Sequence, residues 1–107
     1  MDPRIVLVVY RPLPGKESGL MTAVKKHVSV LKHEGLVTDR MPVVMKAKDG
    51  AIVEIFEWKS AAAIEQAHAN PAVQQLWAEF NAVCTYEKPV NVAEFHNMFS
   101  EFEPVSF

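Results

Sequence analysis

The sequence predicts an α+β fold in which helices cover one face of an antiparallel β-sheet. Residues 5–10 (IVLVVY) and 52–58 (IVEIFEW) are rich in β-branched and aromatic side chains, as buried strands are. Residues 16–34 carry apolar side chains at helical spacing. Asp49-Gly50 is a strong hairpin dipeptide, because Gly tolerates the positive φ of tight turns. The strands on either side of this dipeptide should therefore pair antiparallel.

In chain order, the first strand (5–10) leads into a proline-rich connection at 11–15, through which we expect neither strand nor helix to run. An amphipathic helix follows over 16–34, and Gly35 closes it in the left-handed conformation that helix ends favour. The inner stripe of this helix is predicted to comprise Leu20, Val24, His27, Val28 and Leu31.

The second half begins with a predicted strand over 40–47, which the hairpin joins to 52–58. Ser60 is the expected N-cap of the next helix, because its hydroxyl can accept a hydrogen bond from a free N–H of the first turn. Asn70 and Pro71 repeat this device and start a further helix.

After Cys84 the helical pattern breaks, and we expect a short helical turn over 90–96 and a last strand over 99–107. The order β, α, β-hairpin, split α, β is that of a ferredoxin-like sandwich with a four-stranded antiparallel sheet. Nothing remains in this order to cover the second sheet face, although its strands are apolar there too. An exposed patch of that kind predicts a homodimer packed sheet to sheet, as a dimeric α/β barrel.

The composition fits one globular domain spanning 1–107, with 50% hydrophobic and 22% charged residues. A formal net charge of −2 disfavours a nucleic-acid partner. The single Cys84 and the lack of a CxxC pair favour a reducing, cytoplasmic location. The apolar run at 5–10 is too short for a membrane span of about 20 residues, so we expect no membrane partner.

Three residues are candidates for catalysis. His68 and His27 lie on predicted inner helix stripes, where a near-neutral imidazole can serve as a general base, although either can also be a structural core histidine. Glu54 interrupts an apolar strand, and a buried carboxylate needs a partner. It either faces the helices and shares their cavity or, the interpretation we favour, pairs with Arg40 or Lys46 on the other face.

Three aromatic residues are candidates for ligand binding. Trp58 and Trp77 are flat enough to sandwich an aromatic ligand, and Tyr10 ends its strand with a hydroxyl group. The chain has no HxH or HxxxH pair, so we predict no metal site, and Gly15 with Gly19 does not make a phosphate loop. We therefore expect no bound cofactor.

The Glu57-Trp58-Lys59-Ser60 step, the His68-Ala69-Asn70-Pro71 junction between the later helices, and the aromatic tail together resemble the dimeric α/β barrel superfamily. Within it, the likeness is to the antibiotic-biosynthesis monooxygenase-like group and covers residues 5 to about 102. Members of the superfamily include cofactor-free oxygenases, haem-degrading oxygenases, lactone isomerases and many proteins of unknown function.

The resemblance implies a cofactor-independent, monooxygenase-like enzyme that acts on a hydrophobic aromatic or polyketide-type molecule, with His68 or His27 removing a phenolic proton. The alternative is a non-catalytic ligand-binding or stress-associated dimer. Haem degradation is disfavoured, because that branch typically needs an Asn on the first strand, and 5–10 has none. Trp77 also stands where the likeness would place the iron-ligating His.

Overall fold

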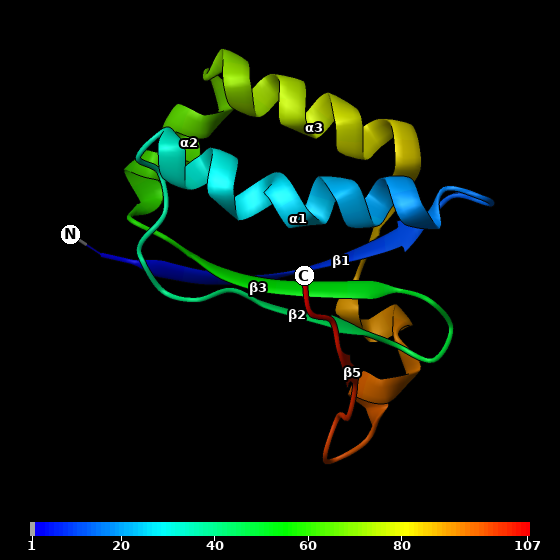
Figure 1. Ribbon diagram of the computed structural model, residues 1–107. Helices are drawn as coiled ribbons and strands as arrows, with labels where there is room; N and C mark the ends of the chain where they lie inside the picture. Colours follow the sequence, from blue (N-terminus) through cyan, green and yellow to red (C-terminus); the bar gives the residue numbers. More distant parts are fainter. Residues whose placement is uncertain (1) are drawn as a thin grey trace.

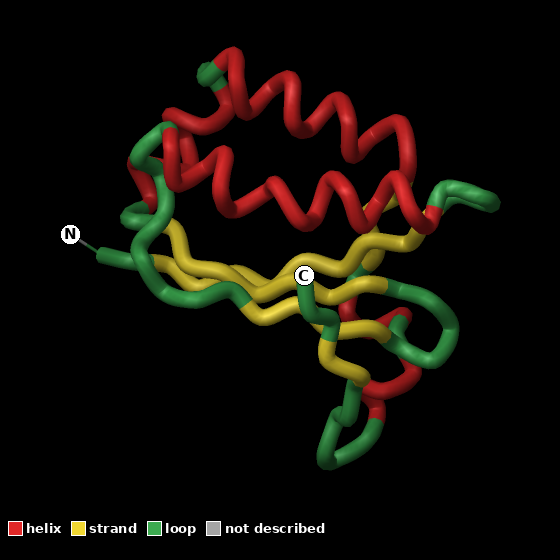
Figure 2. Tube along the Cα trace, viewed as in Figure 1, coloured by secondary structure: helices red, strands yellow, loops and turns green. Residues whose placement is uncertain are grey.

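The computed structural model describes residues 2–107 as a layer of helices on a β-sheet (Figures 1 and 2). The elements are β1 (Arg4–Pro12), α1 (Glu17–His33), β2 (Val43–Lys46), β3 (Ile52–Trp58), α2 (Ala61–His68), α3 (Pro71–Val83), β4 (Cys84–Glu87), the 3-10 helices η1 (Pro89–Asn91) and η2 (Ala93–His96), and β5 (Glu103–Pro104). The α-helices all lie on one face of the sheet, which confirms the predicted α+β, ferredoxin-like class.

The sheet has the strand order β4-β1-β3-β2-β5, and every neighbouring pair is antiparallel. The central strand β3 is paired along its whole length with β1, and Glu54 stands opposite both Val8 and Val44. The Asp49-Gly50 hairpin joins β2 to β3 as predicted, with Gly50 at φ +97°.

The predicted helix ends are confirmed. Ser60 Oγ accepts a hydrogen bond from the Ala63 N–H at 3.1 Å, and Asn70 Oδ1 accepts one from the Ala72 N–H at 2.9 Å. These caps satisfy first-turn donors and separate α2 from α3. Gly35 follows α1 with φ +74°, the left-handed conformation expected of a residue that closes a helix.

The predicted sheet is wrong at three places. It has five strands rather than four, because residues 84–87 form β4, which pairs with β1. β1 therefore runs into the proline-rich connection as far as Pro12, opposite Cys84. The final strand expected over 99–107 is only the two residues of β5. The sequence CTYE lacks the apolar alternation of a strand, so pairing with β1, rather than local sequence, specifies β4.

The outer sheet face, opposite the α-helices, is only half open, which corrects the expectation that nothing in the chain covers it. The short helical turn predicted over 90–96 is present as η1 and η2, and these lie beneath the sheet (Figure 1). Val92 packs there against Val9 and Val53 and is fully buried. Towards the start of β1 the same face stays exposed at Ile5, Leu7 and Val43.

The inner face packs α1 and α3 closely onto the sheet. A Cβ atom added at Gly19 would stand 2.9 Å from Val83 Cγ1, so the glycine permits the close approach of the two helices. No helix within residues 2–107 has both the length and the apolar character to cross a membrane.

Candidate active site

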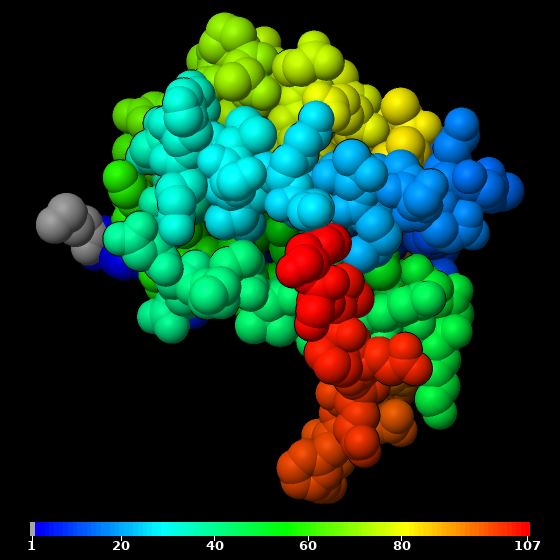
Figure 3. All heavy atoms as spheres, in the orientation of Figure 1, coloured from blue at the N-terminus to red at the C-terminus, as the bar shows by residue number. Residues whose placement is uncertain are grey.

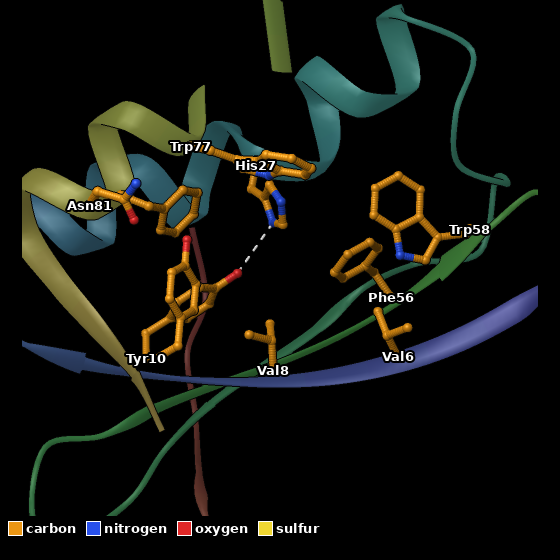
Figure 4. Close-up of a pocket in the computed structure, with 10 residues that line it drawn as sticks. Val6, Val8, Tyr10, His27, Phe56, Trp58, Trp77 and Asn81 are labelled. Atoms are coloured by element: carbon orange, nitrogen blue, oxygen red, sulfur yellow. Dashed lines mark hydrogen bonds between the residues drawn. The ribbon is translucent and has the colours of Figure 1, made fainter. Parts of the chain in front are cut away.

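A pocket of about 420 Å³ opens between the helices and the inner face of the sheet (Figure 4). Its apolar lining comes from Val6, Val8, Phe56, Trp58, Trp77 and Phe80. Four polar side chains complete it: Tyr10, His27, Asn81 and Tyr86. Mostly apolar walls with a few convergent polar groups are typical of a site for a small organic molecule.

A buried polar cluster of Tyr10, His27 and Glu54 lies at the inner end of this pocket. Glu54 Oε1 accepts hydrogen bonds from the Tyr10 hydroxyl at 2.6 Å and from His27 Nδ1 at 2.7 Å. The dashed line in Figure 4 joins the Tyr10 hydroxyl to His27 Nδ1, 3.5 Å apart. The three side chains are 2%, 4% and 1% exposed, so the cluster is screened from bulk water.

Three different elements place these side chains together. Tyr10 stands opposite Ile52 and Val8 opposite Glu54, so strand alternation points Tyr10 and Glu54 to the same, helix-facing side. His27 comes from the inner stripe of α1, which is predicted by the helical spacing. The paired strands and the packed helix therefore fix the carboxylate between its two donors.

Aromatic contacts hold the cluster in place. The Tyr10 ring stacks on Phe80 with centroids 4.8 Å apart, and the His27 ring makes T-shaped contacts with Phe56 and Phe80, with centroids 5.1 and 5.0 Å apart. Burial, together with the adjacent Glu54 charge, raises the pKa of Tyr10 above its ordinary value. The phenol therefore stays neutral and donates a hydrogen bond to Glu54.

His27 is left with one free ring nitrogen. Because a carboxylate only accepts hydrogen bonds, Nδ1 carries a proton, and in the neutral imidazole Nε2 therefore keeps a lone pair. Nε2 has no hydrogen-bond partner among residues 2–107. In that range every buried side-chain nitrogen or oxygen without a partner keeps some accessible surface, so Nε2 must do so as well. His27 lines the pocket, so Nε2 opens into it. A carboxylate on one nitrogen and a cavity at the other is the arrangement of a general base.

His68 is not part of this cluster, and its expected position on the inner stripe is wrong. Its side chain is exposed, with Nδ1 2.9 Å from the Ile64 carbonyl oxygen, and the inner positions of α2 are Ala63 and Ala67. Its ring lies at a steep angle to the Trp77 ring, with the two ring centroids 5.1 Å apart.

The favoured partner of Glu54 is also wrong. Glu54 binds Tyr10 and His27 on the helix side, while Arg40 pairs with Glu57 on the outer face, with Nε 3.2 Å from Oε1. The other candidates do come together, because Tyr10, His27, Trp58 and Trp77 all line the pocket.

Two polar lining residues were not predicted from the sequence. Asn81 lies four residues after Trp77 on α3, so helical periodicity places both on one face and was a usable signal. Tyr86 lies on β4, the strand that local sequence does not specify, and no pattern indicated it.

Cys84 packs as a small buried residue. Its Sγ donates to the Phe80 carbonyl at 3.2 Å, and burial raises the pKa of the thiol to about 11. Across residues 2–107 no group of three or more His, Cys, Asp or Glu side chains is arranged to hold a metal ion.

Comparison of the fold with solved structures identifies two similar proteins. SnoaB, a cofactor-independent oxygenase from Streptomyces nogalater, aligns with a TM-score of 0.64 at 16% identity over 81% of this chain and 88% of its own. Rv0793 from Mycobacterium tuberculosis aligns with a TM-score of 0.63 at 18% identity over 86% and 99%. The chain shares the fold of these two proteins. No protein-family model and no curated protein sequence matches the chain.

Proposed function

We propose that the protein is a monooxygenase-like enzyme that oxidises a hydrophobic phenolic small molecule without a bound cofactor. The observation that carries this proposal is the position of His27, between the buried Glu54 carboxylate and the aromatic pocket. The likeness in fold to a cofactor-independent oxygenase is in keeping with it.

In the proposed reaction, His27 Nε2 accepts the proton of the substrate hydroxyl, and Glu54 stabilises the imidazolium that forms. The resulting phenolate is electron-rich enough to reduce dioxygen, and a ring carbon bonds to one oxygen atom. The other oxygen leaves as water, taking the displaced ring hydrogen and the proton returned by His27. In sum, a phenol with one ring C–H and one O2 give a quinone and one water.

The walls of the pocket suit a flat substrate. Trp58 and Trp77 offer large aromatic faces, and the ring centroids of Phe56 and Trp58 lie 5.4 Å apart. Asn81 and Tyr86 are exposed, so they are available to bind a polar group at the outer end of the substrate. The substrate hydroxyl would point inward to His27.

The proposed active unit is a homodimer formed through the open half of the outer face. Ile5, Leu7 and Val43 are 58%, 39% and 50% exposed, and Ile55 stands opposite both Leu7 and Val43 in the sheet. An apolar patch at the middle of a sheet is typical of a protein interface. The single cysteine, buried and unpaired, fits a cytoplasmic location for this dimer.

The test compares two histidines of the same chain. Oxygen consumption should be measured with a panel of phenols and hydroquinones, using the wild type, His27→Gln and His68→Gln. Loss of a general base should lower the rate about 10²- to 10⁴-fold in His27→Gln. The exposed His68 serves as the matched control, and its variant should stay within a few fold of the wild type.

Circular dichroism and substrate binding by fluorescence separate a catalytic defect from misfolding. Equal loss in both variants, or an unchanged rate in His27→Gln, would contradict the assignment of His27. Stabilisation by a phenol that no condition turns over would instead favour the non-catalytic ligand-binding function.

A further inference from the structure

A second, smaller cavity of about 270 Å³ lies behind the buried cluster, on the side away from the pocket. The C-terminal residues cross its mouth, lying against α1 in Figure 3. The Val105 N–H donates to the Val44 carbonyl at 2.9 Å and anchors this segment. At the rim, Met41 and Phe107 are 82% and 59% exposed.

Glu54 is the one residue of the buried cluster that borders this cavity, and it does not border the first pocket. Both of its hydrogen bonds use Oε1, and no donor within residues 2–107 reaches Oε2. No buried side-chain oxygen in that range is both unpaired and sealed, so Oε2 keeps a small accessible surface even though Glu54 as a whole is only 1% exposed. The geometry points this oxygen into the second cavity.

Water alone suits this cavity poorly. A bound water needs two to four polar partners, and apolar cavities without them tend to stay dry. Val24, Val28 and Val44 form the inner walls, and besides Glu54 the only charged side chain in the lining, among residues 2–107, is Lys25 at the exposed side. A molecule with one strong hydrogen-bond donor and an apolar body would suit both the carboxylate and the valine walls.

We propose that the second cavity binds a small apolar monoamine in its protonated form. The ammonium group would donate to Glu54 Oε2, and the hydrocarbon part would pack on the three valines. A volume of 270 Å³ matches about nine water molecules at roughly 30 Å³ each, and so a ligand of about six to eight heavy atoms. The positive charge of Lys25 disfavours a second cationic group and so selects monoamines over diamines.

The site is coupled to the pocket, because one carboxylate serves both cavities. Oε1 orients the His27 ring, and an ammonium ion on Oε2 would compete for the same negative charge. Binding of the amine should therefore alter His27 and the affinity of the first pocket, and by linkage a pocket ligand should alter amine affinity by the same factor.

The experiment is an NMR titration of the full chain, with backbone amides and histidine ring nitrogens labelled with ¹⁵N. The probe is 3-methylbutylamine, with 3-methylbutan-1-ol and 3-methylbutanoate as matched neutral and anionic controls. We expect saturable shifts at His27 and around Val44, with the amine binding at least tenfold more tightly than either control.

Two variants locate the site. Glu54→Gln removes the charge and should weaken amine binding at least tenfold, and Val44→Phe should fill the cavity and abolish binding while Glu54 is intact. Should Glu54→Gln fail to fold, Val44→Phe still decides the question. No saturation below about 10 mM amine, equal affinity for the alcohol, or unchanged binding by Val44→Phe would overturn the proposal. These readouts need no turnover, so they stand or fall separately from the oxygenase activity.

Discussion

Each face of β3 carries one glutamate, and the two faces differ in how that carboxylate is bound. The helix-facing side buries Glu54 between two donors, next to a pocket. The outer side keeps its carboxylate, Glu57, near the sheet margin, where it accepts from Thr38 Oγ1 at 2.8 Å and pairs with Arg40. A buried carboxylate is weak evidence for stability even when it is hydrogen-bonded, because the cost of desolvating it offsets much of what its hydrogen bonds contribute. The inner cluster is therefore better explained by chemistry than by folding.

The outer face shows a second contrast along one strand. Val9 is 1% exposed because η1 and η2 cover it, whereas Leu7, two residues earlier on the same side of β1, is 39% exposed. We expect the same substitution to act differently where this chain covers the sheet and where the proposed second copy would cover it.

The largest expected effect comes from this pair. Val9→Lys places a charge in a closed apolar site and should cost about 5 kcal/mol or more, enough to unfold a marginal domain. Leu7→Lys places it on the open half and should leave the protomer folded but dissociate the dimer. Circular dichroism with sedimentation velocity at micromolar concentration distinguishes the outcomes. A folded wild-type monomer under those conditions would refute the proposed interface.

The next effect concerns the inner cluster. His27→Leu leaves Glu54 buried with Tyr10 as its remaining partner and should destabilise the protein by about 3–5 kcal/mol. Replacing all three polar residues, as Tyr10→Phe, His27→Leu and Glu54→Leu, should restore a wild-type denaturant midpoint, because no buried charge is then left unpaired. A triple variant as unstable as the sum of its single variants would show that the cluster contributes to stability after all.

Local sequence was sufficient for much of the fold. Ser60, Asn70 and Gly50 act through residues close to them in sequence. Their hydrogen bonds and turn preferences therefore follow from the local sequence, without any tertiary contact. Strand β4 could not be predicted from its local sequence. Its four residues have no strand pattern, and they form a strand because β1 offers an unpaired edge after α3 ends.

The position of a candidate site residue was predicted correctly on a long helix and wrongly on a short one. Helix α1 spans 17 residues, so the inner position of His27 was well defined. Helix α2 has only eight residues; its inner positions are Ala63 and Ala67, whereas His68, the next residue along and also expected to face inward, is exposed. The partner of Glu54 depends on which sheet face the helices cover, which no local pattern determines.

The smallest expected effect is at the rim of the outer face, where Arg11 bridges two carboxylates. Its Nη1 lies 3.1 Å from Asp49 Oδ2, and its Nε lies 3.0 Å from Glu87 Oε2. The Ala51 N–H and then Arg11 lower the pKa of Asp49, and the Asn91 amide and then Arg11 lower the pKa of Glu87.

Lowered carboxyl pKa values stabilise the folded state above the unfolded-state values of about 4, and this stability is lost as the pH falls through the folded-state values. In Arg11→Gln both pKa values should move back towards normal. The free energies of unfolding of the variant and the wild type, measured in urea from pH 7 to pH 2.5, should therefore differ slightly at neutral pH and converge in acid. A gap that persists at pH 2.5 would mean that Arg11 acts through packing of its side chain rather than through its charge. These solvated ion pairs would then contribute little to the free energy of unfolding.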